Sequence, residues 1–297
     1  MWCNFYTYVA YGTSERKDCS FLAHRFLSYL YKVIPIATYK DSVDPKGVII
    51  AFTVIFLWFA SLVFLLSIDL NWSSPITYIG ILVQTHLYTG LFITAHDAMH
   101  GIVSSNKKLN HGIGWFAAIL FSYNFYWRLF PKHHEHHRFV ATDKDPDYHP
   151  SGNFFIWYFS FIKQYVSVWQ ILLMAITFNI LKLFIPTENL IVFWMLPAIL
   201  STLQLFYFGT YLPHMGESKN KHHSKTQSKN HLWAFISCYF FGYHYEHHDA
   251  PWTPWWRLWK IKEDYQEKEL SASLTVTQYS ISNRSEVRSP KSDVPDI

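Results

Sequence analysis

The segment His244-Tyr245-Glu246-His247-His248 lies near the C-terminal end of the apolar part of this 297-residue chain. It has the same spacing as an earlier segment, His133-His134-Glu135-His136-His137. Residues three and four apart lie on one face of a helix, so each H-x-x-H-H segment is predicted to aim three imidazoles at one point. A third segment, His96-Asp97-Ala98-Met99-His100, places two histidines four residues apart. We call these segments the three histidine boxes.

The boxes indicate a metal site. Imidazole is a ligand of Fe, Zn, Cu and Ni, and three boxes in one chain suggest one shared site. Three histidines at each H-x-x-H-H spacing and two in the third box make eight candidate ligands, and His214 would be a ninth. Structural zinc takes about four ligands, so this set suits two metals. Because a lone histidine is more often a solvated or a core residue, we expect His222, His223 and His231 of the hydrophilic loop 217–231 to be solvated.

Composition narrows the class of protein. Aromatic residues make up 20% of the chain, which fits the belts that membrane proteins place at the bilayer interface. The net charge of +4 is too small to suggest binding to nucleic acid. The three cysteines, Cys3, Cys19 and Cys238, contain no CxxC and do not predict a disulfide framework or a thiolate metal site. They fit a reducing cytoplasmic setting, and no N-terminal signal peptide is expected.

Four apolar segments are long enough to cross a bilayer, for which a helix needs about 20 residues. They are residues 47–68, 76–95, 167–185 and 190–212. Lys182 lies near one end of the third segment, where its side chain can reach the interface. Pro197 lies inside the fourth. The second helix is expected to end where His96 begins.

Shorter apolar segments lie between the histidines. Residues 112–127 and 232–243 are too short to span, and we expect interfacial or re-entrant helices there. The domain prediction is a membrane domain at 47–262, flanked by two other regions. Residues 1–46 form an N-terminal extension, either an interfacial helix or a poorly ordered segment. Residues 263–297 are Ser-rich and charged, which predicts a disordered C-terminal tail.

The basic residues predict the orientation in the membrane. Of the 25 Lys and Arg residues, 24 fall on one side if residues 1–46 are inside, with Lys182 the exception. All three boxes, His214 and both termini then lie on the cytoplasmic side. The predicted fold is an all-α, multi-pass integral membrane protein with four transmembrane helices, short re-entrant or interfacial helices and a cytoplasmic histidine-rich cap.

The box sequences HDAMH, HHEHH and HYEHH resemble those of membrane fatty acid desaturases and hydroxylases, and the resemblance covers about 47–262. Within that superfamily the chain most resembles the CrtW-type β-carotene 4-ketolases of bacteria and cyanobacteria. The resembling stretches are LYTGLFITAHDAMHG (87–101), DPDYH (145–149), LQLFYFGTYLPH (203–214) and FGYHYEHHDAPWTPWW (241–256).

The resemblance implies two non-haem irons that use O2 to oxidise C4 of a β-ionone ring. The implied ligands are His96, His100, His133, His136, His137, His214, His244, His247 and His248. Two hydroxylations and a loss of water would give echinenone or canthaxanthin from β-carotene, and astaxanthin from zeaxanthin. The implied partners are a carotenoid from the bilayer, membrane lipid and an external electron donor such as reduced ferredoxin.

Several polar residues near the boxes are candidates for supporting roles. Asp145 and Asp147 are tentative catalytic residues, either orienting a ligand or facing the substrate, or else ordinary turn residues. Asp97, Glu135 and Glu246 would either orient imidazoles or lie on solvated helix faces. His111 is a further candidate, although an ordinary interfacial histidine is slightly favoured.

Other functions remain open from the residues alone. A fatty acid desaturase or a carotenoid 3-hydroxylase would share the boxes. A membrane metal transporter or sensor would need polar groups along a path at mid-bilayer, and 47–68 and 76–95 offer only Gln84 and His86. A hydrolytic zinc enzyme is disfavoured by the number of histidines.

Overall fold

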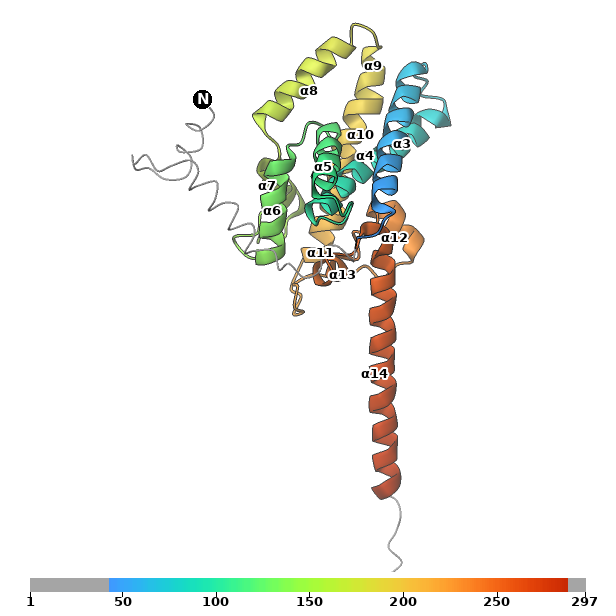
Figure 1. Ribbon diagram of the computed structural model, residues 1–297, viewed down its shortest axis with the longest axis vertical. Helices are drawn as coiled ribbons and strands as arrows, with labels where there is room; N and C mark the ends of the chain where they lie inside the picture. Colours follow the sequence, from blue (N-terminus) through green and yellow to red (C-terminus); the bar gives the residue numbers. More distant parts are fainter. Residues whose placement is uncertain (1–42, 288–297) are drawn as a thin grey trace, which may run out of the picture. The chain divides into compact units, whose positions relative to one another are not determined.

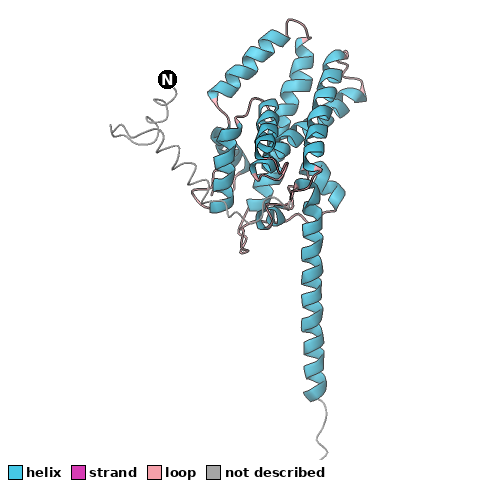
Figure 2. Cartoon of the chain, in the orientation of Figure 1, coloured by secondary structure: helices cyan, strands magenta, loops and turns pink. Residues whose placement is uncertain are grey.

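The computed structural model describes residues 43–287, and all its regular elements in that range are helices (Figures 1 and 2). This confirms the all-α prediction for the described part of the chain. Residues 1–42 and 288–297, which hold most of the predicted N-terminal extension and the end of the predicted tail, lie outside the described residues.

Two long apolar helices pack side by side. α3 (Gly47–Ser67) is followed by α4 (Pro75–Met99), whose start is fixed by Ser74, because the Ser74 hydroxyl accepts a hydrogen bond from the Ile76 amide. The close approach depends on Gly80, where a Cβ would lie 2.5 Å from the Leu65 side chain. α4 does not end at His96, as the sequence predicted, but continues through the first box.

A third long helix runs without interruption from Thr187 to His214, over 28 residues, and agrees with the predicted span at 190–212. It consists of α9 (Thr187–Leu190), the π-helical η1 (Ile191–Met195), α10 (Leu196–Leu205), the π-helical η2 (Phe206–Tyr211) and α11 (Leu212–His214). Pro197 and Pro213 each follow a π-helical segment. A π turn is wider than an α turn, so the chain accommodates a proline ring without a break.

The predicted span at 167–185 is not one straight helix. α7 (Phe154–Tyr165) and α8 (Val168–Leu181) meet at an angle of 83°. α8 alone would reach only about 21 Å, against a hydrocarbon thickness of about 30 Å. The break arises because Val166 is extended and the Ser167 side chain caps α8 by accepting from the Gln170 amide. The described residues therefore offer three membrane-spanning candidates, or four if the bent pair counts as one.

The shorter helices surround the ends of the long ones. α5 (Lys107–Leu120) and α6 (Tyr126–Phe139) replace the single segment predicted at 112–127. The break falls at Ser122 and Tyr123, which both have positive φ. α12 (His231–Cys238) covers only part of the segment predicted at 232–243, and a second left-handed pair, Tyr239 and Phe240, leads towards α13 (His244–Asp249).

The C-terminal region differs from its prediction. After the 3-10 turn η3 (Trp255–Arg257), α14 runs from Leu258 to Val287, so residues 263–287 are helical rather than disordered (Figure 1). Its first half is rich in Lys and Glu, which are strong helix formers even where no core is available. The low apolar content of residues 263–287 therefore indicates that they pack against no core, and it does not indicate that they are disordered.

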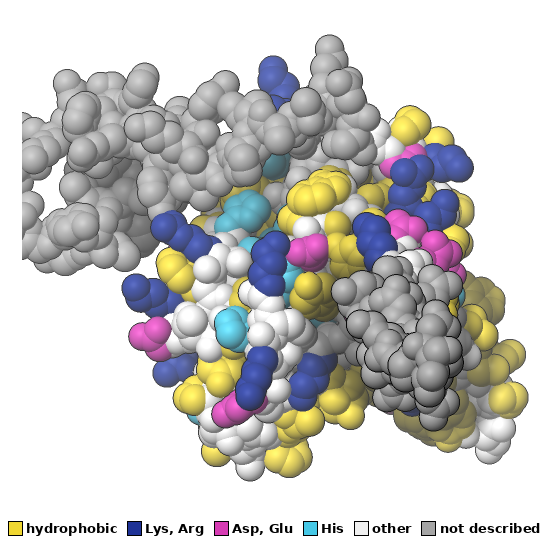
Figure 3. Space-filling view, turned by 90° about the horizontal axis from the view of Figure 1, so that it is seen from below, with side chains coloured by type: hydrophobic (Ala, Val, Ile, Leu, Met, Phe, Trp, Pro, Cys, Tyr) yellow, Lys and Arg dark blue, Asp and Glu magenta, His cyan; other side chains and the backbone are white. Residues whose placement is uncertain are grey.

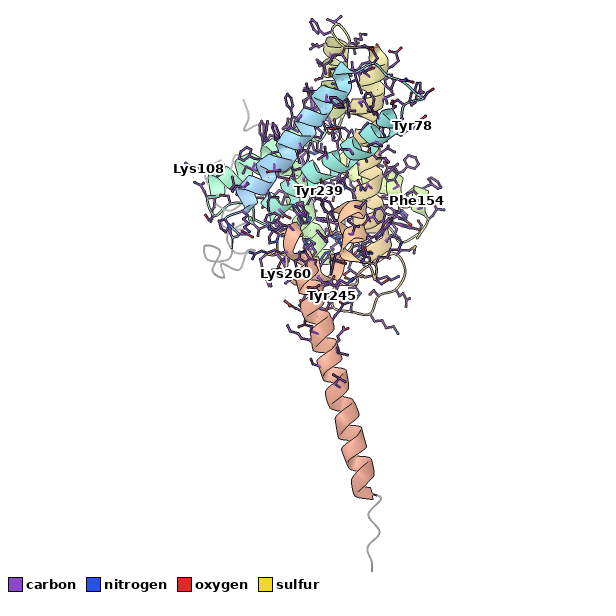
Figure 4. The ribbon with its side chains drawn as sticks, turned by 90° about the vertical axis from the view of Figure 1, so that its right-hand side faces the viewer. Tyr78, Lys108, Phe154, Tyr239, Tyr245 and Lys260 are labelled. Carbon is purple, nitrogen blue, oxygen red and sulfur yellow. The ribbon has the colours of Figure 1, made fainter. Side chains whose placement is uncertain are left out.

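Large apolar side chains are exposed along the outer faces of α3, α4 and α8. They include Phe52, Phe56, Phe59, Ile79, Leu82, Trp169, Ile171 and Ile176. In Figure 4, Lys260 lies at the lower end of the bundle, where α14 begins, and Lys108 lies on the side opposite Tyr78. Seen from below, Lys and Arg side chains are spread around the histidines (Figure 3). This distribution fits an apolar body within lipid and a basic end in water.

Candidate metal centre

Four elements carry the histidines to one end of the bundle (Figure 1). The last turn of α4 carries His96, and His100 is its C-cap. The second box lies on α6 and the third on α13, while His214 ends the long helix at α11. All nine predicted histidines are brought together, from segments up to 152 positions apart in the sequence (His96 to His248).

The histidines form two groups, in each of which the potential ligand atoms lie within 4.8 Å of one another. We call His96, His100, His133, His137 and His247 the first group. Its shortest separations join Nε2 of His133 to Nε2 of His100 at 2.6 Å, and Nε2 of His137 to Nε2 of His247 at 3.0 Å.

The second group consists of His136, His214, His244 and His248, all buried. Nε2 of His248 lies 3.1 Å from that of His136 and 2.9 Å from that of His244. Nε2 of His214 lies 2.9 Å from that of His244. The nitrogens of this group thus point towards a common centre.

Each H-x-x-H-H box is divided between the two groups, which corrects the prediction that its three imidazoles meet at one point. On α6, His133 and His137 enter the first group and His136 the second. On α13 the assignment is reversed, since His244 and His248 enter the second group and His247 the first. Neighbouring helix positions differ by about 100° around the axis, so the last two histidines of a box diverge.

The geometry and electrostatics of both groups fit metal ions. Burial, and then the neighbouring imidazoles, hold the pKa of His100, His133, His137, His244 and His248 well below the usual range, so they are neutral at pH 7. Neutral imidazole is the form that binds a metal. Two ligands at a right angle on a metal, with bonds of about 2.1 Å, lie about 3 Å apart. The buried Nε2 of His96 has no hydrogen-bond partner among the described residues.

Asp145 lies directly behind one of these histidines. Its carboxylate is 2.9 Å from Nδ1 of His136, which places the proton on Nδ1 and leaves Nε2 free to bind. The same carboxylate accepts the amides of Ala141 and Asp147, both at 2.9 Å. Burial lowers the pKa of His136, but Asp147 and Asp145 together outweigh it and raise that pKa.

An apolar cavity borders both groups. Its wall includes His96, His133, His136, His244 and His247, and otherwise mostly apolar side chains such as Phe92, Leu129, Phe161 and Phe241. Its volume is about 100 Å³, and it lies between helices of the bundle, where small-molecule sites are common. Asp147 also lines it, accepting a hydrogen bond from the Tyr165 hydroxyl. Burial raises the pKa of Asp147 to about 6.

Comparison with known proteins agrees with this geometry. The family model described as "Fatty acid desaturase" matches residues 71–185 and 153–280, which together cover most of the chain. The chain belongs to the fatty acid desaturase family. No solved structure is significantly similar to it.

Within this family the similar curated proteins are carotenoid ketolases. The chain is 36% identical over 239 residues to a zeaxanthin 4-ketolase of Chlamydomonas reinhardtii, covering 74% of this chain and 54% of the relative. It is 36% identical over 252 residues to beta-carotene 4-ketolase 3 of Haematococcus lacustris, covering 72% and 78%. It is 38% identical over 181 residues to a beta-carotene ketolase of Paracoccus sp. (strain PC1), covering 59% and 74%. The chain thus spans about half the length of the first relative and about three quarters of the others.

Among the other candidates in this desaturase-family chain, Asp97 lies beside a ligand group. It is 3.4 Å from Nδ1 of His96 and accepts the amide of Trp255 at 3.1 Å. Glu135 is exposed, and Glu246 accepts a hydrogen bond from Thr226. His111 contacts the Tyr126 hydroxyl at 3.1 Å and is not part of either group.

Of the loop histidines, His223 is exposed, as predicted, whereas His222 and His231 are less solvated than predicted. The His222 side chain is 14% exposed, and its Nε2 lies 2.8 Å from the Asp249 carboxylate. The backbone carbonyl of His223 lies 3.2 Å from Nδ1 of His214, which therefore has a partner behind it. His231 is 42% exposed but contacts the Tyr243 hydroxyl at 2.8 Å. Helical spacing gave no signal for these contacts, because they join a loop to positions up to 27 residues away.

Proposed function

We propose that this chain is a carotenoid 4-ketolase that converts the C4 methylene of a β-ionone ring to a ketone. The observation that carries the proposal is the pair of buried histidine groups at the inner wall of an apolar cavity. An apolar ring in that cavity would lie against the groups. The similarity to proteins named as beta-carotene and zeaxanthin ketolases supports this choice among oxidations of apolar substrates.

The first and second histidine groups would each hold one non-haem iron. A methylene C–H bond offers nothing to a general acid or base, so the metals supply the oxidising power by using O2. The protein's residues would hold His100, His133, His137, His244 and His248 neutral, fix the tautomer of His136 through Asp145 and exclude water through the apolar wall. These roles fit iron better than a hydrolytic zinc.

The overall balance requires two rounds of oxidation. Each round inserts one oxygen atom of O2 into a C4–H bond and reduces the other to water, with two electrons and two protons. The first round gives a C4 alcohol and the second a geminal diol, which loses water to form the ketone. β-Carotene would give echinenone or canthaxanthin, and zeaxanthin would give astaxanthin.

The substrate would enter from the lipid. Carotenoids dissolve in the bilayer, and the cavity lies where α7 and α8 bend apart, since Phe161, Ile162, Val166 and Gln170 all line it. Exposed apolar residues such as Phe159 and Trp169 lie on the same two helices. A ring could therefore pass from the hydrocarbon to the histidines without entering water.

The chain would cross the membrane four times, with the histidines on the cytoplasmic side. At the end away from the histidines, the Asn189 side chain donates to the Ile68 carbonyl at 2.7 Å, so the end of α3 and the start of α9 lie together. At the histidine end, the Trp157 indole of α7 donates to the Asp147 carbonyl at 2.6 Å. The bent pair α7–α8 therefore has to connect one end with the other. The basic residues favour the cytoplasm for the histidine end.

Electrons would come from a separate acidic protein such as ferredoxin. The loop 217–231 carries Lys219, Lys221, Lys225 and Lys229 at the histidine end. A basic surface attracts an acidic donor, and salt weakens that attraction. We expect ferredoxin-supported ketone formation by the membrane-embedded enzyme to fall several-fold between low and high salt. Reduction of the irons by dithionite should not fall; an equal loss would contradict docking by charge.

Pigment analysis tests the function directly. β-Carotene-producing bacterial cells that express the full chain should accumulate echinenone or canthaxanthin, identified by chromatography and mass. Zeaxanthin as the product would instead mean a carotenoid 3-hydroxylase. Unchanged β-carotene, from protein shown to be in the membrane with iron bound, would reject carotenoid oxidation and direct attention to a lipid desaturase.

A further inference from the structure

Thr210 is a polar residue in the mostly apolar wall of the cavity. It lies in the π-helical segment η2 and is 5% exposed. It lines the cavity beside Leu205, Phe241 and His244. No hydrogen bond involves its hydroxyl among residues 43–287. A threonine hydroxyl without a partner in the protein can pair with a polar group of a molecule in the cavity.

Other threonines on the long helices behave differently. The hydroxyls of Thr53, Thr85 and Thr94 each donate to the carbonyl four residues earlier, at 2.7–2.8 Å. Thr210 lies in a π-helical segment, and its hydroxyl makes no such bond. The π segment therefore leaves Thr210 able to donate to, or accept from, a molecule in the cavity.

Thr210 also lies close to the second histidine group along the helix. It precedes His214 by four residues, about 6 Å along a helix, and His214 belongs to the second group. The neighbouring residue is Gly209, where a Cβ would meet only the Phe241 ring, at 3.5 Å. A ring whose C4 lies at the histidines would therefore have room beside the Thr210 hydroxyl.

We propose that Thr210 binds the hydroxyl of the C4 alcohol formed in the first oxidation and holds it for the second. This rests on the proposed function. A substrate such as β-carotene has no polar atom, so the Thr210 hydroxyl has a partner only after the first round. Binding the alcohol slows its escape to the lipid and turns the remaining C4–H bond towards the irons. Thr210 thus determines whether the product is an alcohol or a ketone.

The test is the ratio of C4 alcohol to C4 ketone in β-carotene-producing cells. Thr210→Val has nearly the same shape without the hydroxyl, and we expect it to raise this ratio about fivefold to tenfold, the effect of losing one buried hydrogen bond. Thr210→Ser keeps a hydroxyl and should restore a ratio close to that of the unaltered chain.

Thr202→Val is the matched control. Thr202 lines the same cavity eight residues earlier on the same helix, but its hydroxyl already pairs with the Tyr158 hydroxyl at 2.9 Å. It should leave the alcohol-to-ketone ratio unchanged. Equal ratios in Thr210→Val and the unaltered chain, with ketone formed by both, would overturn the inference. Absence of both products from the unaltered chain would instead reject the proposed function.

A second substrate separates the C4 hydroxyl from a hydroxyl already present at C3. In zeaxanthin-producing cells, Thr210→Val should again raise the share of C4 alcohol among the products. Reduced conversion of zeaxanthin, together with an unchanged product ratio from β-carotene, would overturn the assignment to the intermediate. That result would place the C3 hydroxyl of the substrate at Thr210.

Discussion

Asp145 shows how one residue outside the ligand groups can control a ligand. Its carboxylate is fully buried, lies 2.9 Å from Nδ1 of His136 and accepts two backbone amides as well. The amides fix the carboxylate, and the carboxylate fixes the imidazole. A carboxylate behind a metal-binding histidine also raises the basicity of the nitrogen that faces the metal.

We expect Asp145→Asn to lower iron affinity and activity about 10–100-fold, the effect that losing such a partner has at metal sites. An amide can still accept one hydrogen bond but carries no charge. Iron content of the purified membrane protein and ketone yield measure the effect. Asp143→Asn is the control, because Asp143 is exposed in the same loop. Full iron loading in Asp145→Asn would contradict the role given to Asp145.

Two neighbouring histidines of the second box offer a sharper comparison. His133 belongs to the first group, whereas His134 belongs to neither and packs against the Phe130 ring. We expect His133→Ala to lose ketone formation and to reduce bound iron. His134→Ala should retain both. Iron retained by His133→Ala at the level of the unaltered chain would exclude His133 as a ligand.

At this scale the sequence predicted that the eight box histidines lie together, because their spacing within each box is local, whereas His214 followed only from the family resemblance. It did not predict their division, which depends on how α6 and α13 face each other. Asp145 was one of several carboxylates near a box, and only its contact with His136 distinguishes it from Glu135. Thr210 gave no signal, since its importance depends on a π turn that composition does not reveal.

Among the elements, α5 packs closely on its neighbours through a glycine. A Cβ at Gly114 would lie 2.6 Å from the Cβ of Ala98 and from the Tyr126 ring. Small residues at such contacts let helix backbones approach within a membrane. Since Ala98 lies inside the first box on α4, this contact also helps to set the position of His96 and His100.

Gly114→Ala should therefore destabilise the fold by about 1–3 kcal/mol, the usual cost of overpacking. Gly112→Ala on the same helix has nothing within 4 Å of its added Cβ, and should be neutral or stabilising by up to about 1 kcal/mol. Thermal unfolding in detergent compares the two variants. A Gly114→Ala variant as stable as Gly112→Ala would mean that helix propensity, and not the contact with Ala98, decides the outcome.

The sequence predicted elements well where length and apolar content decide them. The spans at α3, α4 and α9–α11 were predicted on that basis. The bend between α7 and α8 was missed, because it depends on the cap that Ser167 makes and not on hydropathy. The helix α14 was missed because its polar composition predicted disorder. Its residues bury no core, but many of them are strong helix formers.

For the whole molecule, the contact of Asn189 with Ile68 predicts that the end of α3 and the start of α9 lie on the same side of the membrane, away from the histidines. Single cysteines at Ser73 and Leu183, in a chain lacking Cys3, Cys19 and Cys238, should react with an impermeant maleimide from outside the cell. A cysteine at Ser228 should react only in inverted vesicles. If the cysteine that replaces Leu183 reacts only from the inside, the bent pair α7–α8 does not cross the membrane.

The molecule as a whole was predictable to the level of an all-helical membrane protein with histidines at one end. Hydropathy and the distribution of Lys and Arg determine that much, because both follow from the solvent around each segment. The cavity and the depth of its lining residues were not predictable, since they depend on bends and π turns in particular helices.

The division of each box between the two groups also has a mechanical consequence. α6 and α13 are each a single helix, and each holds nitrogens of both groups. A small rotation of α6 that draws His133 and His137 towards one centre must move His136 relative to the other. If the two groups hold metal ions, as proposed above, a shift of the ligands at one ion would therefore move ligands at the other through the helix backbone.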